Sequence, residues 1–218
     1  MYPSKEKSVI YVFDAYCGWC WGFSQRMSEF EQANRDRVNF TAISGGLFTG
    51  SRIVPISHLT HVAEANERIT GLTGAEFGSK FLEIVEQGSF EMDSGAAGAA
   101  MAALRAQAPD RAVDWTKQLQ EAFYIRGLSL SDPSTVAAIA SANGLDAEKV
   151  LQSLADGTAQ AQAKADFAFS RRLRVSSYPT LLYTDGTNVH QLPATGTPLG
   201  QLNGILDDLL ARDMGAAT

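Results

Sequence analysis

The sequence predicts an α/β fold in which a small β-sheet is interrupted by a long helical segment. An apolar run at residues 9–13 leads into a Cys-Gly-Trp-Cys motif and then into a helical stretch. The middle of the chain has the pattern of helices almost throughout, and two short strand-like runs and a last helix close it. We therefore expect a core made of residues 1–56 and 174–218, with residues 57–173 inserted as an all-helical domain.

The first part of the chain predicts a strand, a helix and a second strand. Residues 9–13 are nearly all β-branched or aromatic, which favours a buried strand. Residues 17–33 carry Phe23, Met27 and Phe30 at helical spacing, and residues 38–43 alternate between apolar and polar as a strand does. A strand, helix and strand in this order predict a parallel pair joined by a right-handed crossover.

The inserted block predicts seven helices, each bounded by Gly, Pro or a capping residue. We expect them at 58–70, 74–87, 94–106, 111–126, 133–143, 147–155 and 159–173. The clearest start is Asp132-Pro133, a capping acid followed by proline at the first helical position. Asn143-Gly144 is a typical helix end.

The last part of the chain predicts a β-hairpin and a helix. Residues 180–184 and 188–192 have the pattern of strands, and Asp185-Gly186 between them is a strong hairpin signal. A terminal helix is expected from Thr197-Pro198.

Cys17 and Cys20 are the candidate catalytic residues. The free N–H groups and the positive dipole end at a helix start favour a thiolate, so Cys17 is the candidate nucleophile. Cys20 lies one turn deeper on the same face and is the candidate resolving thiol. Because the chain has no other cysteine, it holds no structural disulfide, which suits a reducing compartment.

The strand, Cys-X-X-Cys and helix at the start, together with Tyr178-Pro179 before a late strand, resemble the thioredoxin superfamily. The long helical insertion makes the chain most similar to DsbA-like thiol–disulfide oxidoreductases, in the FrnE-like, predicted protein-disulfide isomerase branch. The resemblance implies that Pro179 is a cis-proline beside the motif, and that Trp19, Tyr178 and Pro179 bind substrate. It implies no metal or organic cofactor. The expected partners are proteins or small molecules that carry thiols or disulfides, with glutathione among the candidates.

Asp14 is a candidate proton relay. Thioredoxin and DsbA place a buried acid six residues before the first cysteine, and this chain has Tyr11 there. Asp14, three residues before Cys17, is the acid that could replace it. The alternative is that Asp14 closes a turn or caps the helix, as Asp commonly does.

Composition and charge exclude several partners. A net charge of −6 and a pI near 5.1 argue against general affinity for nucleic acid or an anionic membrane, and we expect no basic stripe. No apolar stretch is long enough to span a bilayer, and the first residues lack the apolar region of a signal peptide. We therefore expect a cytoplasmic protein.

Three other functions stay open from the residues. His58 and His61 could join Cys17 and Cys20 in a Cys₂His₂ zinc site, although the insertion has no need of zinc to fold. The kappa-type glutathione transferases and chromene-carboxylate isomerases are similar in fold, but they use serine in place of Cys17. A redox-inert binding protein is the remaining alternative, and loss of activity in a double Cys→Ser variant would reject it.

Overall fold

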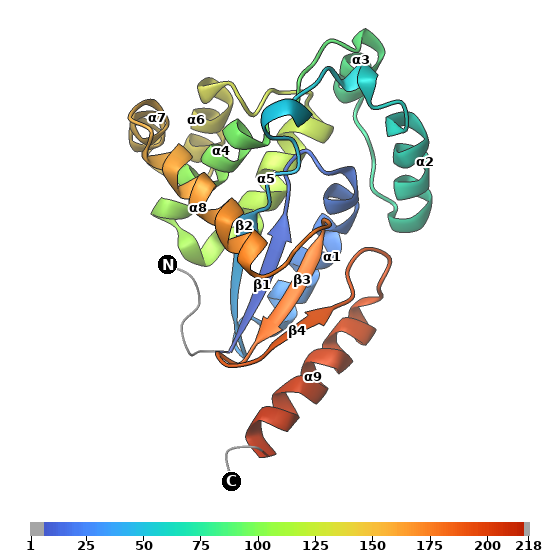
Figure 1. Cartoon of the computed structure of the whole chain (residues 1–218), viewed down its shortest axis with the longest axis vertical. Helices are drawn as coiled ribbons and strands as arrows, with labels where there is room; N and C mark the ends of the chain where they lie inside the picture. The colour runs from blue at the N-terminus through green and yellow to red at the C-terminus, as the bar shows by residue number, and fades with distance from the viewer. Residues whose placement is uncertain (1–6, 216–218) are drawn as a thin grey trace.

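The computed structural model describes residues 7–215 and contains a four-stranded sheet with helices on both faces (Figure 1). The strands are β1 (Ser8–Phe13), β2 (Asn39–Ser44), β3 (Thr180–Thr184) and β4 (Val189–Leu192). The helices are α1 (Gly18–Asn34), α2 (Val62–Thr73), α3 (Ser79–Gln87), α4 (Ser94–Gln107), α5 (Ala112–Tyr124), α6 (Pro133–Ala142), α7 (Ala147–Ala155), α8 (Thr158–Arg172) and α9 (Leu199–Gly215). Short 3₁₀ turns lie at Gly50–Arg52, Ile56–His58 and Pro109–Arg111.

The sheet brings the two ends of the chain together. Its strand order is β2-β1-β3-β4, with β1 and β2 parallel, as the sequence predicts, and the other pairs antiparallel. Val12 near the end of β1 lies opposite Thr180 at the start of β3. The segment after β1, which carries the two cysteines, therefore meets the segment before β3, which carries Pro179.

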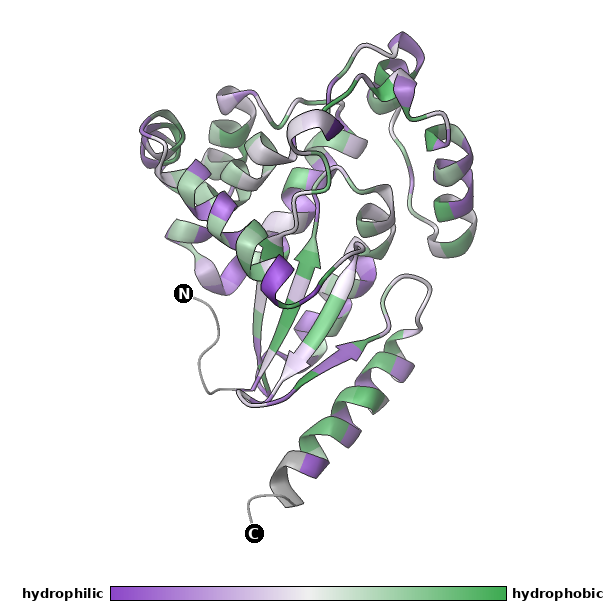
Figure 2. Cartoon of the chain, viewed as in Figure 1, coloured by the Kyte–Doolittle hydropathy of each residue, from purple (hydrophilic) through white to green (hydrophobic). Residues whose placement is uncertain are grey.

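The two faces of the sheet are covered by different parts of the chain. Val9, Tyr11 and Phe13 face the large core that includes residues of α1 and α9. Ile10 and Val12 point the other way, into a small cluster with Ile43 and Leu182 that Phe169 and Leu173, at the end of α8, help to cover. Three of the four residues of the edge strand β4 are exposed, and Figure 2 shows much of this strand in purple, the colour of hydrophilic residues. The last helix of the inserted block thus packs on the core sheet.

Most predicted elements are confirmed to within a few residues, and two helix starts are wrong. α2 begins at Val62 instead of residue 58, because His58 lies in a short 3₁₀ turn and His61 precedes the helix. α3 begins at Ser79 instead of residue 74, because Gly74 ends α2 in a left-handed conformation with φ 75°. The division into a core and an inserted domain at residues 57–173 stays a prediction.

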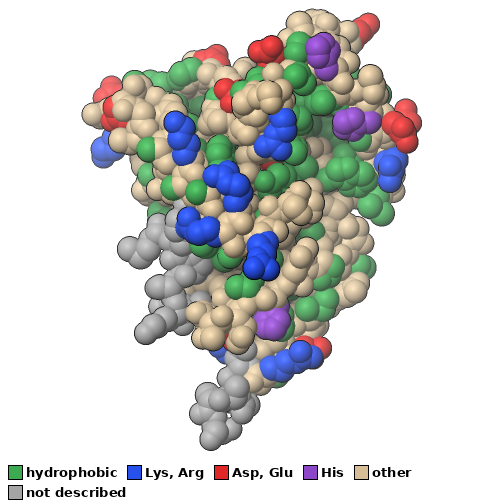
Figure 3. Space-filling view, viewed as in Figure 1, with side chains coloured by type: hydrophobic (Ala, Val, Ile, Leu, Met, Phe, Trp, Pro, Cys, Tyr) green, Lys and Arg blue, Asp and Glu red, His purple; other side chains and the backbone are tan. Residues whose placement is uncertain are grey.

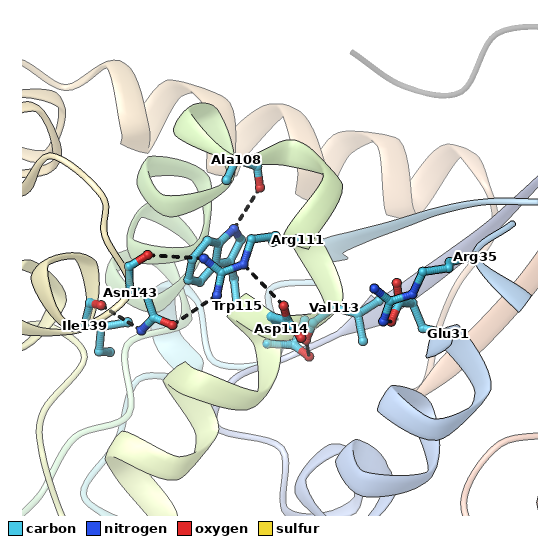
Figure 4. A network of polar contacts seen from close by, with 10 residues as sticks. Glu31, Arg35, Ala108, Arg111, Val113, Asp114, Trp115, Ile139 and Asn143 are labelled. Carbon is cyan, nitrogen blue, oxygen red and sulfur yellow. Dashed lines mark hydrogen bonds and ion pairs between the residues drawn. The ribbon is translucent and has the colours of Figure 1, made fainter. Parts of the chain in front are cut away.

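A polar network joins the start of α5 to the end of α6 (Figure 4). The Arg111 guanidinium donates to the backbone and side-chain oxygens of Asn143 and lies 4.2 Å from the Trp115 ring centroid. The Trp115 indole donates to the carbonyl of Ala108 at 2.9 Å. These contacts satisfy the carbonyl of Asn143, the residue that follows α6, and join the end of α6 to the start of α5.

Candidate active site

Cys17 is the N-cap residue of α1. Its backbone is extended (φ −87°, ψ 111°), and its Sγ accepts a hydrogen bond from the Cys20 N–H at 3.4 Å. Its own N–H donates to the Asp14 carbonyl at 3.1 Å, which closes the turn between β1 and α1. The sulfur therefore lies at the positive end of the helix dipole.

Cys20 lies behind Cys17 and is fully buried, whereas Cys17 retains 6% of its surface. Burial raises the pKa of the Cys20 thiol well above its ordinary value of 9.0, and the neighbouring Cys17 raises it further. The Tyr11 hydroxyl points to the Cys20 carbonyl at 3.5 Å, so the position of the family's buried acid is filled by a neutral phenol. Burial also raises the pKa of Tyr11. The Cys20 thiol is thus a weaker acid than a free cysteine.

The segment before β3 closes the other side of Cys17. The Cys17 thiol donates to the Tyr178 carbonyl at 3.5 Å, and the Tyr178–Pro179 peptide bond is cis. The Tyr178 hydroxyl donates to the Gly45 carbonyl at 2.7 Å. A Cβ on Gly45 would lie 1.9 Å from the Tyr178 ring, so only glycine fits there.

Asp14 accepts hydrogen bonds from three groups and is 1% exposed. The Tyr16 N–H donates to its Oδ1 at 3.0 Å, the Ser94 hydroxyl to Oδ1 at 2.9 Å, and the Leu47 N–H to Oδ2 at 2.8 Å. Burial raises the pKa of Asp14 above its ordinary 3.8, against these hydrogen bonds, which lower it. The bond from Tyr16 is a turn contact, as one interpretation predicted, but Asp14 does not cap α1 because Cys17 holds that position. Its carboxylate joins β1 to the loop after β2 and to the start of α4.

α2 packs directly on the motif helix. A Cβ on Gly18 would lie 3.0 Å from Ile69 Cδ1, and one on Gly22 would lie 2.7 Å from Ile69 Cγ2. Ile69 is fully buried. The glycine between the cysteines is therefore part of a groove that holds the inserted block against α1.

Trp19 lies at the mouth of an apolar pocket that also contains Cys17. Phe48, Ile69 and Phe123 are among the other residues that line the pocket. The Trp19 ring is half-buried, and the Arg68 guanidinium lies 5.7 Å from its centroid. An apolar group attached to a sulfur at Cys17 would have this pocket beside it.

The predicted histidines do not form a metal site with the cysteines. Among residues 7–215, no group of three or more His, Cys, Asp and Glu side chains is arranged to hold a metal ion. His61 lines the apolar pocket, while His58 lies in the preceding 3₁₀ turn. The Cys₂His₂ alternative thus lacks its ligand set in the described part of the chain.

Two residues of the site were not predicted from the sequence. For Gly45, the sequence signal is the adjacent pair Gly45-Gly46, because two glycines permit close backbone approach. For Tyr11, the sequence shows only that it stands in place of an acid. Its contact with Cys20 depends on the pitch of β1 against α1, which the sequence pattern does not give.

One comparison with known proteins identifies a family. The profile of the DSBA-like thioredoxin domain matches residues 8–195. No curated protein sequence matches the chain. Among the described residues, no helix is long and apolar enough to cross a membrane.

Solved structures with similar folds include proteins of different activities. A "putative protein disulfide isomerase" from Nitrosomonas europaea has 18% identity and a TM-score of 0.81, covering 95% of this chain and 98% of that chain. The cytosolic disulfide reductase DsbM from Pseudomonas aeruginosa has 23% identity and a TM-score of 0.73, covering 96% and 98%, and it has also been solved with GSH. A 2-hydroxychromene-2-carboxylate isomerase has 14% identity and a TM-score of 0.67, covering 97% and 100%. These similarities show the fold, and the profile match over most of the sequence shows that the chain belongs to the DSBA-like thioredoxin domain family.

Proposed function

We propose that the protein is a thiol–disulfide oxidoreductase with Cys17 as nucleophile and Cys20 as resolving thiol. The observation that carries the proposal is the arrangement of three atoms. The Cys17 sulfur lies at the start of α1, touches the Tyr178 carbonyl, and has the buried Cys20 one turn behind it. The Cys17 sulfur is partly exposed and can meet a substrate, whereas the buried Cys20 sulfur can meet only Cys17.

The exchange proceeds in two steps that conserve electrons. The Cys17 thiolate attacks a substrate disulfide, a bond forms between Cys17 and one substrate sulfur, and the other substrate sulfur leaves as a thiolate. Cys20 then loses its proton and attacks Cys17, which releases the second substrate thiol and leaves a 17–20 disulfide. The protein is oxidised by two electrons as the substrate disulfide is reduced. The reverse steps oxidise a dithiol.

The substrate segment is proposed to lie along Tyr178 and Pro179. Proline has no N–H, and the Tyr178 carbonyl already faces Cys17, so an extended peptide can add its backbone beside this segment. Trp19 and the apolar pocket would receive a side chain next to the reacting sulfur. These contacts hold the disulfide near Cys17 while exchange occurs.

Asp14 is proposed as the proton relay for Cys20. A hydrogen bond with the Asp14 backbone lowers the pKa of the Cys20 thiol, and the Asp14 charge raises it. Burial raises the pKa of Asp14 itself. Asp14 is therefore suited to exchanging a proton with a buried group. Tyr11, the other polar side chain at Cys20, is a weaker acid and is proposed to remain neutral.

The proposed substrates are thiol- or disulfide-containing proteins or small molecules. Glutathione is included because the related DsbM has been solved with it. A cytoplasmic location is proposed from the absence of any cysteine outside the motif. The serine-dependent isomerase class is not favoured, because this chain carries two thiols at the place where that class uses one hydroxyl.

Disulfide isomerase activity is a more specific version of the proposed oxidoreductase function. It requires that a substrate thiol attacks the mixed disulfide at Cys17 before Cys20 does. A Cys20→Ser variant would then still rearrange a scrambled multi-disulfide protein in a thiol buffer, while it would lose net reduction. Rearrangement by the wild-type protein that equals the buffer alone would exclude this version.

A redox titration tests the proposal. The protein is equilibrated in glutathione buffers, its thiols are trapped with an alkylating agent, and the added mass is counted. A reversible two-electron transition between Cys17 and Cys20 is expected, and its midpoint places the protein nearer thioredoxin, at about −270 mV, or nearer DsbA, at about −120 mV. The Cys20→Ser variant should also accumulate a mixed disulfide at Cys17. Absence of both results would reject the function.

A further inference from the structure

A row of positive charge borders the site on the side of α8. Four exposed cations belong to α8 and the segment after it: Lys164, Arg171, Arg172 and Arg174, called here the α8 cations. Figure 3 shows blue side chains gathered over α8 and the segment that leads to β3. The expectation that no basic stripe exists is therefore wrong for this face, although the whole chain carries a net charge of −6.

The charge of this row is not neutralised by the described part of the chain. Between residues 157 and 179 the only acid is Asp166. Asp166 is fully buried, and its carboxylate pairs inward with Arg105 at 2.8 Å. No ion pair within residues 7–215 involves any of the α8 cations. Their charge therefore faces solvent.

The row lies close to the proposed substrate path. Tyr178 packs on the same small apolar cluster as Phe169 and Leu173, at the end of α8. Ser170, the residue before Arg171, also acts on the Tyr178 hydroxyl and lowers its pKa, although burial raises that pKa by more. Arg174 precedes Tyr178 by four residues, a separation of at most about 14 Å along an extended chain. Of the α8 cations, Arg171 thus adjoins a neighbour of the Tyr178 side chain, and Arg174 lies nearest to Tyr178 along the chain.

Arg174 has a backbone conformation that residues with a Cβ do not favour. Its φ is 59°, the only positive φ at a non-glycine among the described residues. Val175 N–H donates to the Ser170 carbonyl at 3.1 Å and Arg174 N–H to the Arg171 carbonyl at 2.9 Å, a helix ending that usually has glycine in this position. The helix dipole accounts for Arg171 and Arg172 in the last turn. It does not account for an arginine in a left-handed conformation beyond the helix, and such outliers concentrate at functional sites.

We propose that the α8 cations bind acidic residues that flank the reacting cysteine of an extended peptide substrate. The inference rests on the proposed oxidoreductase function and adds a substrate class to it. A peptide rises about 3.3 Å per residue, so acids two to five residues from its cysteine would reach the row. The interaction is short in range, since the Debye length is about 8 Å at physiological salt. A long polyanion would instead meet the negative charge of the rest of the molecule.

The test compares peptides that differ only in flanking charge. Disulfide-linked homodimers of a single-cysteine peptide carry Glu, Gln or Lys at the flanking positions, so both sulfurs of each disulfide are equivalent. The reduced protein is mixed with each dimer in a single turnover, quenched in acid and analysed by mass. Each rate is divided by the rate of the same dimer with dithiothreitol, which removes the effect of charge on the leaving thiol. Bis(2-hydroxyethyl) disulfide measures the basal exchange.

The expected result is a normalised rate roughly tenfold higher for the Glu dimer than for the Gln dimer at low salt, as for steered association. This preference should fall toward one in 0.5 M salt and in the triple variant Arg171→Gln, Arg172→Gln, Arg174→Gln. A matched control, Arg35→Gln, Lys149→Gln, Arg212→Gln, removes three exposed cations from α1's end, α7 and α9 and should keep the preference. Both variants should react with bis(2-hydroxyethyl) disulfide as the wild type does.

Other outcomes would overturn the inference. Equal normalised rates for the Glu and Gln dimers, or a preference that survives in the triple variant, would exclude the α8 cations as a peptide site. A triple variant impaired only with glutathione disulfide would assign the charge to a small substrate instead. Absence of reaction with bis(2-hydroxyethyl) disulfide would reject the oxidoreductase function itself, which is a distinguishable failure.

Arg174→Gly gives a second readout that a structural role would not produce. Glycine suits the left-handed conformation, so the variant should unfold at a higher temperature than the wild type. It should at the same time lose part of the preference for the Glu dimer. Lower thermal stability, or an unchanged preference, would contradict a role of Arg174 in substrate binding.

Discussion

The two sides of Cys17, called here the α2 flank and the Tyr178 flank, are formed by chemically different groups. On the α2 flank, Ile69 packs against Gly18 and Gly22, and the pocket beyond it is apolar. On the Tyr178 flank, a carbonyl touches the Cys17 thiol, a hydroxyl bonds to Gly45, and exposed cations follow. The first flank can constrain the shape of a bound group, and the second can bind its backbone and its charge. The difference indicates that one part of the chain positions a bound group at Cys17 and another part selects which group binds.

The largest effect is expected on the Tyr178 flank, from Gly45→Ala. The new Cβ would lie 1.9 Å from the Tyr178 ring, so the ring must leave its place. Overpacking of this kind should lower the free energy of unfolding by about 3 kcal/mol, measured by urea denaturation. The rate with peptide disulfides should fall as well, since the Tyr178 carbonyl moves from Cys17.

A double variant sharpens this prediction. Tyr178→Ala removes the ring that Gly45→Ala would meet, so the two substitutions together should destabilise the protein less than the sum of their separate effects. Additive losses would show that Gly45 is required for a reason other than its contact with Tyr178.

On the α2 flank, Gly22→Ala should lower the free energy of unfolding by about 2 kcal/mol. Its Cβ would lie 2.7 Å from Ile69 and 3.2 Å from Thr73, and α2 would have to shift. Gly71→Ala is the control on the facing helix, because no atom lies within 4 Å of its Cβ position. This control should gain about 0.5–1 kcal/mol in urea denaturation, as alanine favours the helix. Equal effects of the two substitutions would contradict the packing of α2 on α1.

Between the flanks, Asp14→Asn should lower stability by about 1 kcal/mol at pH 7, since an amide N–H₂ would face N–H donors that now bind a carboxylate. The loss should depend on pH. Because burial raises the pKa of Asp14 above 3.8, the folded state holds its proton more tightly than the unfolded state does. The stability that this provides is complete below about pH 3.8 and is lost as pH rises through the raised pKa.

The measurement is urea denaturation of both proteins from pH 4 to pH 8. The advantage of the wild type over Asp14→Asn should be largest at pH 4 and should shrink with rising pH. Asp36→Asn, at an exposed position, should show no such trend. An advantage that grows with pH would reverse the sign and reject the assigned shift.

The smallest effect is expected from Arg174→Gly, which should raise the free energy of unfolding by about 1 kcal/mol, since a left-handed conformation is unfavourable for residues with a Cβ. Lys164→Gly, at an exposed position in the middle of α8, is the matched control and should be destabilising by about the same amount. Thermal unfolding of the two variants side by side tests the difference in sign.

The sequence predicted the fold where signals are local. Asp132-Pro133 and Asp185-Gly186 mark a helix start and a hairpin through their own backbone preferences, and both are confirmed. The starts of α2 and α3 were wrong because several residues there can cap or continue a helix, and the packing decides between them.

Only the features of the site that depend on local sequence could be predicted. Cys17, Cys20 and Pro179 follow from spacing and from resemblance to a family. The contact between Gly45 and Tyr178 joins residues 133 positions apart, and no local pattern reports it. The α8 cations were hidden for a different reason. Asp166 offsets one of them in a count of charges, but its carboxylate points inward to Arg105, so the count does not describe the surface.

The position of β1 in the sheet has a consequence for synthesis. β1 is an inner strand whose second partner, β3, lies near the other end of the chain, and Cys17 and Tyr178 are 161 residues apart. At 5–20 residues per second, translation leaves on the order of ten to thirty seconds between the emergence of the two. During this interval Cys20 exists without Leu181, Tyr183 and the residues of α9 that belong to the same core. A nascent chain stalled before residue 178 should therefore be alkylated at Cys20 far faster than the finished protein.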